Sequence, residues 1–392
     1  MSHSLQLALQ VIAWLIALLW LWKVIAAAFG LPRVPNLLLP QHNISPTGSP
    51  SITVIVPARN EAADISATLH SLLSQDYPNL HIIAVDDRST DQTGTIIDTI
   101  VAQHPEKLRA FHITELPSGW LGKTHAMALA AHQAPTDYLL FTDADVLFHP
   151  TAIRIALAHA VATHVDHLVI LPTTIIKRFD EAAILGFFQI FSFWAGRPWR
   201  IPDPKAKRDA IGIGAFNLLR REAYQQVGGF ESLRMEIIED VGLGRRIKRA
   251  AHAQRIVFGR GLVCLHWASG ITGLVSVMTK NLWAAFGFSI SLALLGCLWL
   301  LAFCVAPAVA LLFAPTRIPA IFTLAGVAFA YRLMSRRSGI STWNVLFFPL
   351  GALIFIFTLL RSMLLTLKQG GIIWRGTFYP LAELRKNAAT LF

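Results

Sequence analysis

The chain has 392 residues, of which 54% are apolar and only 15% are charged, whereas soluble globular proteins carry about 25% charged residues. The mean hydropathy of +0.52 excludes a disordered chain and an ordinary cytosolic protein, and three cysteines without a CxxC pair exclude a disulfide scaffold. The net charge of +11 fits basic residues beside membrane spans better than a nucleic-acid partner, so we expect no nucleic acid. These features predict a membrane protein with a large water-facing domain.

The first apolar run extends from Leu5 to Phe29 and is long enough to cross a bilayer core of about 30 Å. A cleaved signal peptide is the alternative, but no Lys or Arg precedes the run, which is also too long for a signal core. We therefore expect residues 1–30 to be a retained transmembrane anchor. Lys23 and Arg33, at the end of this run, place the following domain in the cytoplasm.

Residues 45–270 alternate strand and helix signals. Short apolar runs typical of buried parallel strands lie at 51–57, 81–86, 109–113 and 138–142. Segments with helical spacing or helix-capping residues lie between them, at 60–75, 91–102 and 123–132. This order predicts an α/β fold with a doubly wound sheet, in which ligands bind at the carboxyl ends of the strands.

Charged clusters follow three of the predicted strands. Arg59, Asn60 and Glu61 follow the first strand, Asp86 and Asp87 end the second, and the Asp143-Ala144-Asp145 sequence follows the fourth. Two aspartates at i and i+2 after a strand can face one Mg²⁺ or Mn²⁺ ion, which phosphate oxygens usually help to bind. The sequence contains neither GxGxxG nor GxxxxGK[ST], which argues against a dinucleotide-binding dehydrogenase and a P-loop NTPase.

The C-terminal third is apolar again. Runs at 284–314 and 318–331 form a predicted hairpin, followed by a basic loop that begins at Arg332. The last run, 345–367, either spans the membrane or is broken and re-entrant near Pro349 and Gly351, which would return the basic tail 368–392 to the cytoplasm. We therefore expect an interfacial connector at 271–283 and a transmembrane region of two or three spans at 284–367.

Taken together, several segments of residues 50–270 resemble the family 2 glycosyltransferases, which have the GT-A fold. The segments are VIVPARNE (54–61), LLSQDYP (72–78), VDDRSTD (85–91), GWLGK (119–123), TDADV (142–146) and IEDVGLG (238–244). The arrangement of anchor, catalytic domain and C-terminal spans is similar to hopanoid-associated and carotenoid-type bacterial enzymes. The resemblance implies an enzyme with a cytoplasmic GT-A-like mixed sheet.

The resemblance also implies which residues bind the donor. They are Pro57, Arg59, Asn60, Glu61, Asp86, Asp87, Lys123 and Asp143. Asp86 or Asp87 would hold the uracil or the ribose, and Lys123 at a helix N-terminus would face the diphosphate. A turn-capping role for Asp87 and a solvated surface position for Lys123 remain alternatives.

On the acceptor side, the resemblance implies that Asp240 is the catalytic base, with Glu239 beside it. A carboxylate suits this role because an acceptor hydroxyl loses its proton only as the new C–O bond forms; a helix N-cap is the alternative. Gly212 and Gly214 would let the backbone approach the sugar. His266 would join Asp143 and Asp145 as a metal ligand, although a lone histidine before a tryptophan is often a packing residue.

The sequence departs from processive family members, which carry Gln-x-x-Arg-Trp after the catalytic domain. Residues 279–283 keep only Trp283, expected on the acceptor side, with Lys280 as a replacement positive charge. This favours a single, inverting, metal-dependent transfer from a nucleotide-sugar, expected to be a UDP-sugar, to a lipid at the inner membrane. The alternatives are a processive polysaccharide synthase and a non-catalytic membrane scaffold or lipid-binding protein.

Overall fold

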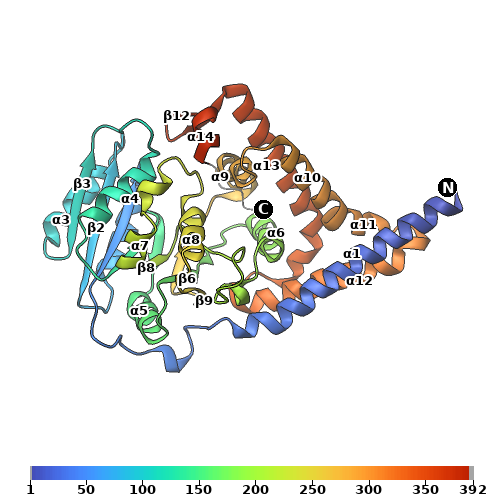
Figure 1. The fold of residues 1–392 in the computed structure, drawn as a ribbon, viewed down its shortest axis with the longest axis horizontal. Helices are drawn as coiled ribbons and strands as arrows, with labels where there is room; N and C mark the ends of the chain where they lie inside the picture. Colours follow the sequence, from blue (N-terminus) through green and yellow to red (C-terminus); the bar gives the residue numbers. More distant parts are fainter. Residues whose placement is uncertain (1, 388–392) are drawn as a thin grey trace.

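The computed structural model describes residues 2–387, and it combines a sheet-containing domain with a group of long apolar helices (Figure 1). The main sheet has seven strands in the order β3-β2-β1-β4-β8-β6-β9. In chain order these are β1 (Ile52–Ala58), β2 (Leu80–Asp87), β3 (Leu108–Ile113), β4 (Tyr138–Phe141), β6 (His167–Leu171), β8 (Asn217–Arg220) and β9 (Gln254–Phe258). Only β8 runs against its neighbours, so the expected α/β fold with a mixed sheet is confirmed.

Helices cover both faces of this sheet because the side chains of its strands alternate between two apolar cores. Val54 and Val56 of β1 belong to one core and Ile55 to the other. The first core includes side chains of α2 (Ile65–Leu73), α3 (Thr93–Gln103) and α5 (Ala152–Ala162). The second includes side chains of α4 (Gly122–His132), α7 (Arg221–Gln226) and α8 (Glu239–Arg249).

A smaller sheet of β5 (Val146–Phe148), β10 (Val263–Leu265) and β7 (Thr173–Thr174) lies beside the end of β4. β5 and β10 are antiparallel, with Leu265 opposite Val146. His266 follows Leu265 and Asp145 precedes Val146, so these two residues lie next to the last pair of the ladder. Residues more than a hundred positions apart are thereby brought to one edge of the domain.

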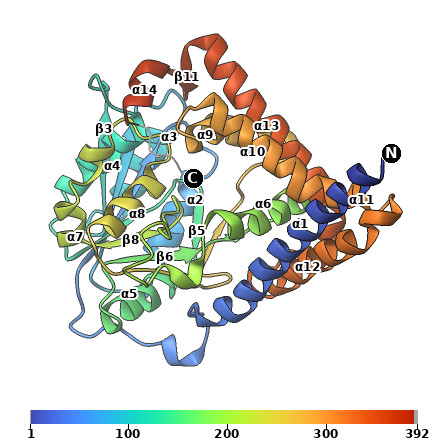
Figure 2. The same ribbon diagram turned by 45° about the vertical axis from the view of Figure 1, so that its right-hand side comes forward.

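Within residues 2–387, four segments are long and apolar enough to cross a membrane. They contain α1 (His3–Gly30), then α10 (Ile290–Leu300) continued by a π-helical turn (Leu301–Val305) and α11 (Ala306–Ala310), then α12 (Ala314–Ser338), and finally α13 (Phe348–Gln369). Helix α12 packs along α1 and contacts α11, while α10 diverges from α12, so the close hairpin expected from the two apolar runs is not formed along their length (Figures 1 and 2). Pro349 lies in the first turn of α13, where a missing N–H costs nothing, so α13 is continuous.

The segments that flank α13 contact the sheet-containing domain. On its N-terminal side, near the end of α12, the Arg337 guanidinium stands 5.3 Å from the ring centroid of Phe258, the last residue of β9. Just after α13, the chain forms a hairpin of β11 (Gly371–Trp374) and β12 (Thr377–Pro380), followed by α14 (Leu381–Asn387). In that hairpin Tyr379 Oη accepts a hydrogen bond of 3.3 Å from the Gly122 N–H at the start of α4.

Two further helices join the domain to the apolar group. α6 (Phe179–Ala195) packs against α13, with the ring of Phe187 5.3 Å from that of Phe348 and 5.8 Å from that of Phe355. α9 (Gly270–Ala285) packs against the other end of α13. The connector expected at 271–283 is therefore helical.

Candidate active site

The predicted polar clusters meet at one edge of the main sheet, where the parallel strands have their carboxyl ends. Arg59 and Glu61 follow β1, Asp87 ends β2, and Asp143 follows β4. Because β8 is antiparallel, it begins at this same edge, and the end of the loop before it brings Gly212 and Gly214 there. The N-terminal turn of α8 adds Glu239 and Asp240.

Lys123 is the centre of the charged cluster. Its Nζ lies 2.5 Å from Asp143 Oδ1 and 2.6 Å from Glu239 Oε1. Burial alone would lower the pKa of Lys123, but Asp143, Glu239 and Asp240 together raise it above its ordinary value. Lys123 is therefore a fixed positive charge, at the N-terminus of α4, between two of the predicted site carboxylates.

Asp240 faces the glycine loop. Its Oδ2 accepts a 2.8 Å hydrogen bond from the Gly214 N–H, and its Oδ1 accepts one of 2.7 Å from the Val241 N–H. Burial and the neighbouring Glu239 carboxylate raise the pKa of Asp240 to about 7. A carboxylate poised near neutral pH is suited to take a proton from a substrate.

The two predicted glycines are needed for this packing. A Cβ on Gly212 would lie 1.8 Å from the backbone oxygen of Asp240, and one on Gly214 would lie 2.6 Å from Asp143 Oδ2. Both glycines therefore allow the loop before β8 to lie directly against the carboxylates. A cavity of about 10 Å³, large enough for about one water, lies among Lys123, Gly214 and Asp240.

The charges around Asp145 show whether the predicted metal site is suited to a cation. Burial, Asp143 and Glu61 raise the pKa of Asp145 to about 7. Carboxylates that repel one another in this way suit a divalent cation, which would relieve the repulsion. Within residues 2–387, however, no three His, Cys, Asp or Glu side chains are already gathered as a metal cluster.

His266 lies beside this site in the backbone register, but its side chain points elsewhere. Its Nε2 lies 3.3 Å from Glu181 Oε1, and Glu181 also accepts hydrogen bonds from the N–H groups of Lys177 and Gly270. Glu181 is fully buried. Ligation by His266 therefore stays a prediction that requires its ring to turn away from Glu181.

On the donor side, Asp87 is buried and paired with arginines. Arg88 Nε donates to Asp87 Oδ1 at 2.7 Å, and Arg59 Nη1 lies 3.8 Å from Asp87 Oδ2. Asp86 instead accepts from the Ser89 N–H and contacts His112. Asp87 thus faces the arginines of the site, whereas Asp86 holds the turn after β2.

Two other donor-side predictions concern the backbone around β1. Pro57 lies inside β1 and is buried between β2 and β4. Asn60 has a positive φ of 54° and accepts from the Thr90 N–H at 2.8 Å. Asn60 therefore ties the loop after β1 to the loop after β2, and it shapes the edge of the site through the backbone.

Trp283 lies away from this edge. Its ring is fully buried, its Nε1–H donates to the Ser289 carbonyl at 3.2 Å, and it packs against Phe288. It is therefore a packing residue in this arrangement, and its expected acceptor-side role stays a prediction.

Two further cations face the site: Lys280, expected from the sequence only as a replacement positive charge, and Arg375, for which no site role was predicted. Lys280 Nζ stands 3.7 Å from the ring centroid of Trp374, and burial and Lys123 lower its pKa to about 8. Arg375, in the turn of the C-terminal hairpin, donates to the carbonyl of Arg59 and to Glu61 Oε1. A basic residue in a Trp-Arg-Gly turn is the only sequence signal for Arg375, and it does not reveal the partner.

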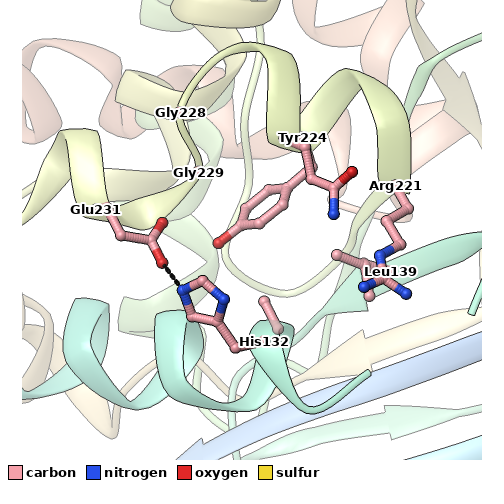
Figure 3. Close-up of a pocket in the computed structure, with 9 residues that line it drawn as sticks. His132, Leu139, Arg221, Tyr224, Gly228, Gly229 and Glu231 are labelled. Carbon is pink, nitrogen blue, oxygen red and sulfur yellow. Dashed lines mark ion pairs between the residues drawn. The ribbon is translucent and has the colours of Figure 1, made fainter. Parts of the chain in front are cut away.

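A larger cavity of about 320 Å³ lies elsewhere (Figure 3). It is lined by His132 at the end of α4, Leu139 at the start of β4, Arg221 and Tyr224. These positions belong to the amino end of the parallel strands, opposite the carboxylate cluster. His132 Nε2 and Glu231 Oε1, 2.5 Å apart, pair at its rim. The cavity is therefore separate from the candidate active site.

Comparisons with known proteins found matches in sequence and in chain path. Residues 53–228 match Glycosyl transferase family 2. The 4,4'-diaponeurosporenoate glycosyltransferases of Staphylococcus aureus strains bovine RF122 / ET3-1 and MRSA252 are each 30% identical over 200 residues, 50% of this chain and 50% of theirs. The chain thus matches about half the length of these curated relatives.

Solved structures with a similar chain path include two glycosyltransferases of low sequence identity. The mannosyltransferase PcManGT from Pyrobaculum calidifontis, in complex with GDP-Man and Mn²⁺, is 18% identical; the alignment covers 90% of this chain and 98% of that chain, with a TM-score of 0.47. S. aureus TarS 1–349 in complex with UDP is also 18% identical, with 74% and 92% covered and a TM-score of 0.41. The similarity to glycosyl transferase family 2 therefore lies in residues 53–228, within the sheet-containing domain.

Proposed function

We propose that the chain is a membrane glycosyltransferase that moves a sugar from a nucleotide-sugar donor to a lipid, with inversion at the anomeric carbon. The observation that carries this proposal is the position of Asp240. Its carboxylate, with a pKa raised to about 7, lies beside the glycine loop and next to Lys123 and Glu239. A non-catalytic scaffold would not need this arrangement.

The residues divide the chemistry between them. Asp240 accepts the proton of the acceptor hydroxyl or carboxyl group as that oxygen attacks the sugar. Lys123 and the N-terminus of α4 hold the diphosphate, on which negative charge grows as the bond to the sugar breaks. Because only unprotonated Asp240 can accept a proton, transfer should slow as the pH falls below about 7.

Asp143 and Asp145 would hold Mg²⁺ or Mn²⁺, with His266 as a further ligand once it leaves Glu181. When bound, the ion would neutralise negative charge on the diphosphate. The mutual repulsion of the carboxylates around Asp145 supports this assignment. The donor is a UDP-sugar in this proposal, with Asp87 toward the nucleoside because it is buried beside Arg59 and Arg88.

A lipid acceptor is supported by the apolar helices next to the site. α9 connects the domain to α10, and its Lys280 reaches the charged cluster. The relatives named for diaponeurosporenoate glycosylation point to an apolar acceptor with a polar end group. We infer that the acceptor's polar end reaches Asp240 from the membrane surface.

We also propose an orientation in the inner membrane. α1, the α10–α11 segment and α12 would cross it, with the N-terminus outside and the sheet domain in the cytoplasm. α13 has 22 residues and would extend about 33 Å, yet the segments on both sides of it contact the domain, through Arg337 of α12 and Tyr379 of the C-terminal hairpin. It would therefore return to the cytoplasmic side, which agrees with the basic tail.

The proposed function can be tested with membranes that carry the chain. They should release UDP from a UDP-sugar when a lipid extract is added, and mass spectrometry should find a lipid one sugar heavier. A chain carrying Asp240→Asn is the matched control. Failure to release nucleoside diphosphate from any UDP- or GDP-sugar would contradict the proposal.

A further inference from the structure

The C-terminal hairpin has a tightly defined turn. Trp374 pairs with Thr377, and the two residues between them, Arg375 and Gly376, both have positive φ, 48° and 78°. Positive φ at both positions is the signature of the type I′ turn, which suits the twist of two-residue hairpins. The turn fixes the direction in which Arg375 leaves the backbone.

This hairpin is docked on the donor side of the candidate active site. Arg375 donates to the Arg59 carbonyl and to Glu61 Oε1, directly after β1. Arg59 Nη1 in turn donates to Thr377 Oγ1 at 3.3 Å, and Tyr379 Oη accepts from the Gly122 N–H. Figure 1 shows β12 and α14 beside α9, on the side of the molecule where the domain meets the apolar helices.

Arg375 also acts electrostatically on the centre of the site. Its positive charge is one of the influences that lower the pKa values of Asp143 and Lys280. Its side chain is 40% exposed, so a ligand can reach it without opening the core. Glu61, its present partner, is a single carboxylate at the edge where a donor diphosphate would lie.

We propose that Arg375 is a diphosphate-binding residue that the C-terminal tail supplies to the donor site, and that it exchanges Glu61 for the diphosphate when the donor binds. This inference rests on the proposed function. Arginine is the side chain best suited to such an exchange because its planar, permanently charged group binds carboxylates and phosphates in the same bidentate manner. The hairpin would then close the donor pocket.

The alternative is that Arg375 only fastens the hairpin to the domain. The two roles differ in what they predict for ligands with and without phosphate. A phosphate ligand affects nucleoside diphosphate binding alone, whereas a fastener that shapes the pocket affects the nucleoside as well. Substitution by lysine also distinguishes the two roles. Lysine keeps the positive charge that attracts a phosphate, but it cannot easily reproduce the two directed hydrogen bonds of Arg375 to the Arg59 carbonyl and to Glu61.

The test uses the full chain in detergent with Mn²⁺. Calorimetry gives the affinities for UDP and GDP. Ligand-observed NMR, which detects weak binding, then gives the affinity for uridine if UDP binds more tightly, or for guanosine if GDP does. The variants are Arg375→Gln and Arg375→Lys. Tyr379→Phe is the control, since it loosens the docking contact to Gly122 and leaves every charge in place.

We expect Arg375→Gln to weaken nucleoside diphosphate binding about 10- to 100-fold, the range of a charged hydrogen bond. Nucleoside binding should stay within about threefold, Arg375→Lys should recover part of the loss, and Tyr379→Phe should retain the affinity. Unchanged diphosphate affinity in Arg375→Gln, or an equal loss for the nucleoside, would overturn the inference. If the unaltered chain binds neither UDP nor GDP, the proposed function itself fails, which is a distinct result.

Discussion

Replacing Lys123 with methionine would leave two carboxylates facing each other without their shared cation. Lys123 Nζ lies 2.5 Å from Asp143 and 2.6 Å from Glu239, and the Glu239 side chain is only 7% exposed. Removing one partner of a buried ion pair typically costs about 3–5 kcal/mol. Lys123→Met should therefore destabilise the sheet domain, and the size of the effect should depend on pH.

The pH dependence follows from a limit on that cost. In the variant, one of the two carboxylates can take up a proton, so the destabilisation cannot exceed the free energy of that protonation. For a carboxyl group of ordinary pKa, about 4, this free energy is about 1.4 kcal/mol for each pH unit above the pKa. The limit is about 4 kcal/mol at pH 7 and about 2 kcal/mol at pH 5.5. Because the Asp143 side chain is 37% exposed, solvent screening reduces the cost to about 1–3 kcal/mol at pH 7.

Thermal unfolding in detergent with EDTA measures this effect. A domain of this size loses about 2–4 °C in melting temperature per kcal/mol, so we expect Lys123→Met to melt about 2–12 °C lower at pH 7 and to approach the unaltered chain at pH 5.5. Lys107→Met, at an exposed position, is the control and should change little. A difference of the same size at both pH values would refute the reasoning.

Three further predictions concern the metal, the membrane orientation and acid stability. Asp145→Asn should abolish Mn²⁺-dependent turnover yet raise the melting temperature without metal, because it removes one of several mutually repelling carboxylates; full activity, or a lower melting temperature, would contradict the assignment. In a cysteine-free background, engineered cysteines at Gln92 and Lys386 should both be labelled from the cytoplasmic side, and labelling of Lys386 from outside would show that α13 spans. Burial lowers the pKa of His167, which lies between Asn217 and Gln254, to about 4. Unfolding should therefore take up a proton between about pH 6.5 and 4, and the domain should lose up to about 3 kcal/mol of stability as the pH falls across that range. Replacement of His167 by glutamine should remove this pH dependence.

The sheet and its functional edge could be predicted from the sequence because the signals are local. The β-branched run at 51–57 and the apolar run at 138–142 each end in charged residues, and parallel strands bring such ends together. Asp143 could be placed at this edge from the strand order, whereas Lys123, Glu239 and Asp240 lie at the starts of α4 and α8 and were expected at the site only from the family resemblance.

The parts that could not be predicted depend on packing between distant segments. The contact of Arg375 with Glu61 joins residues 314 positions apart, and it depends on the path of α13. Whether the last apolar segment spans or returns stays a prediction, but Pro349 lies in the first turn of α13 and does not break it. The contact of Glu181 with His266 could not be predicted either, because the only sequence signal in the helix that carries Glu181 is its many aromatic residues.

The most direct test of the central claim is to measure donor affinity and single-turnover transfer for Asp240→Asn. The substitution keeps the size of the side chain and removes its capacity to accept a proton. The account predicts nucleotide-sugar affinity close to that of the unaltered chain, and sugar transfer to lipid about 10²–10⁴ times slower, the range expected for loss of a general base. A large loss of donor affinity with an unchanged rate in the bound complex would contradict the account and would move Asp240 to the donor site.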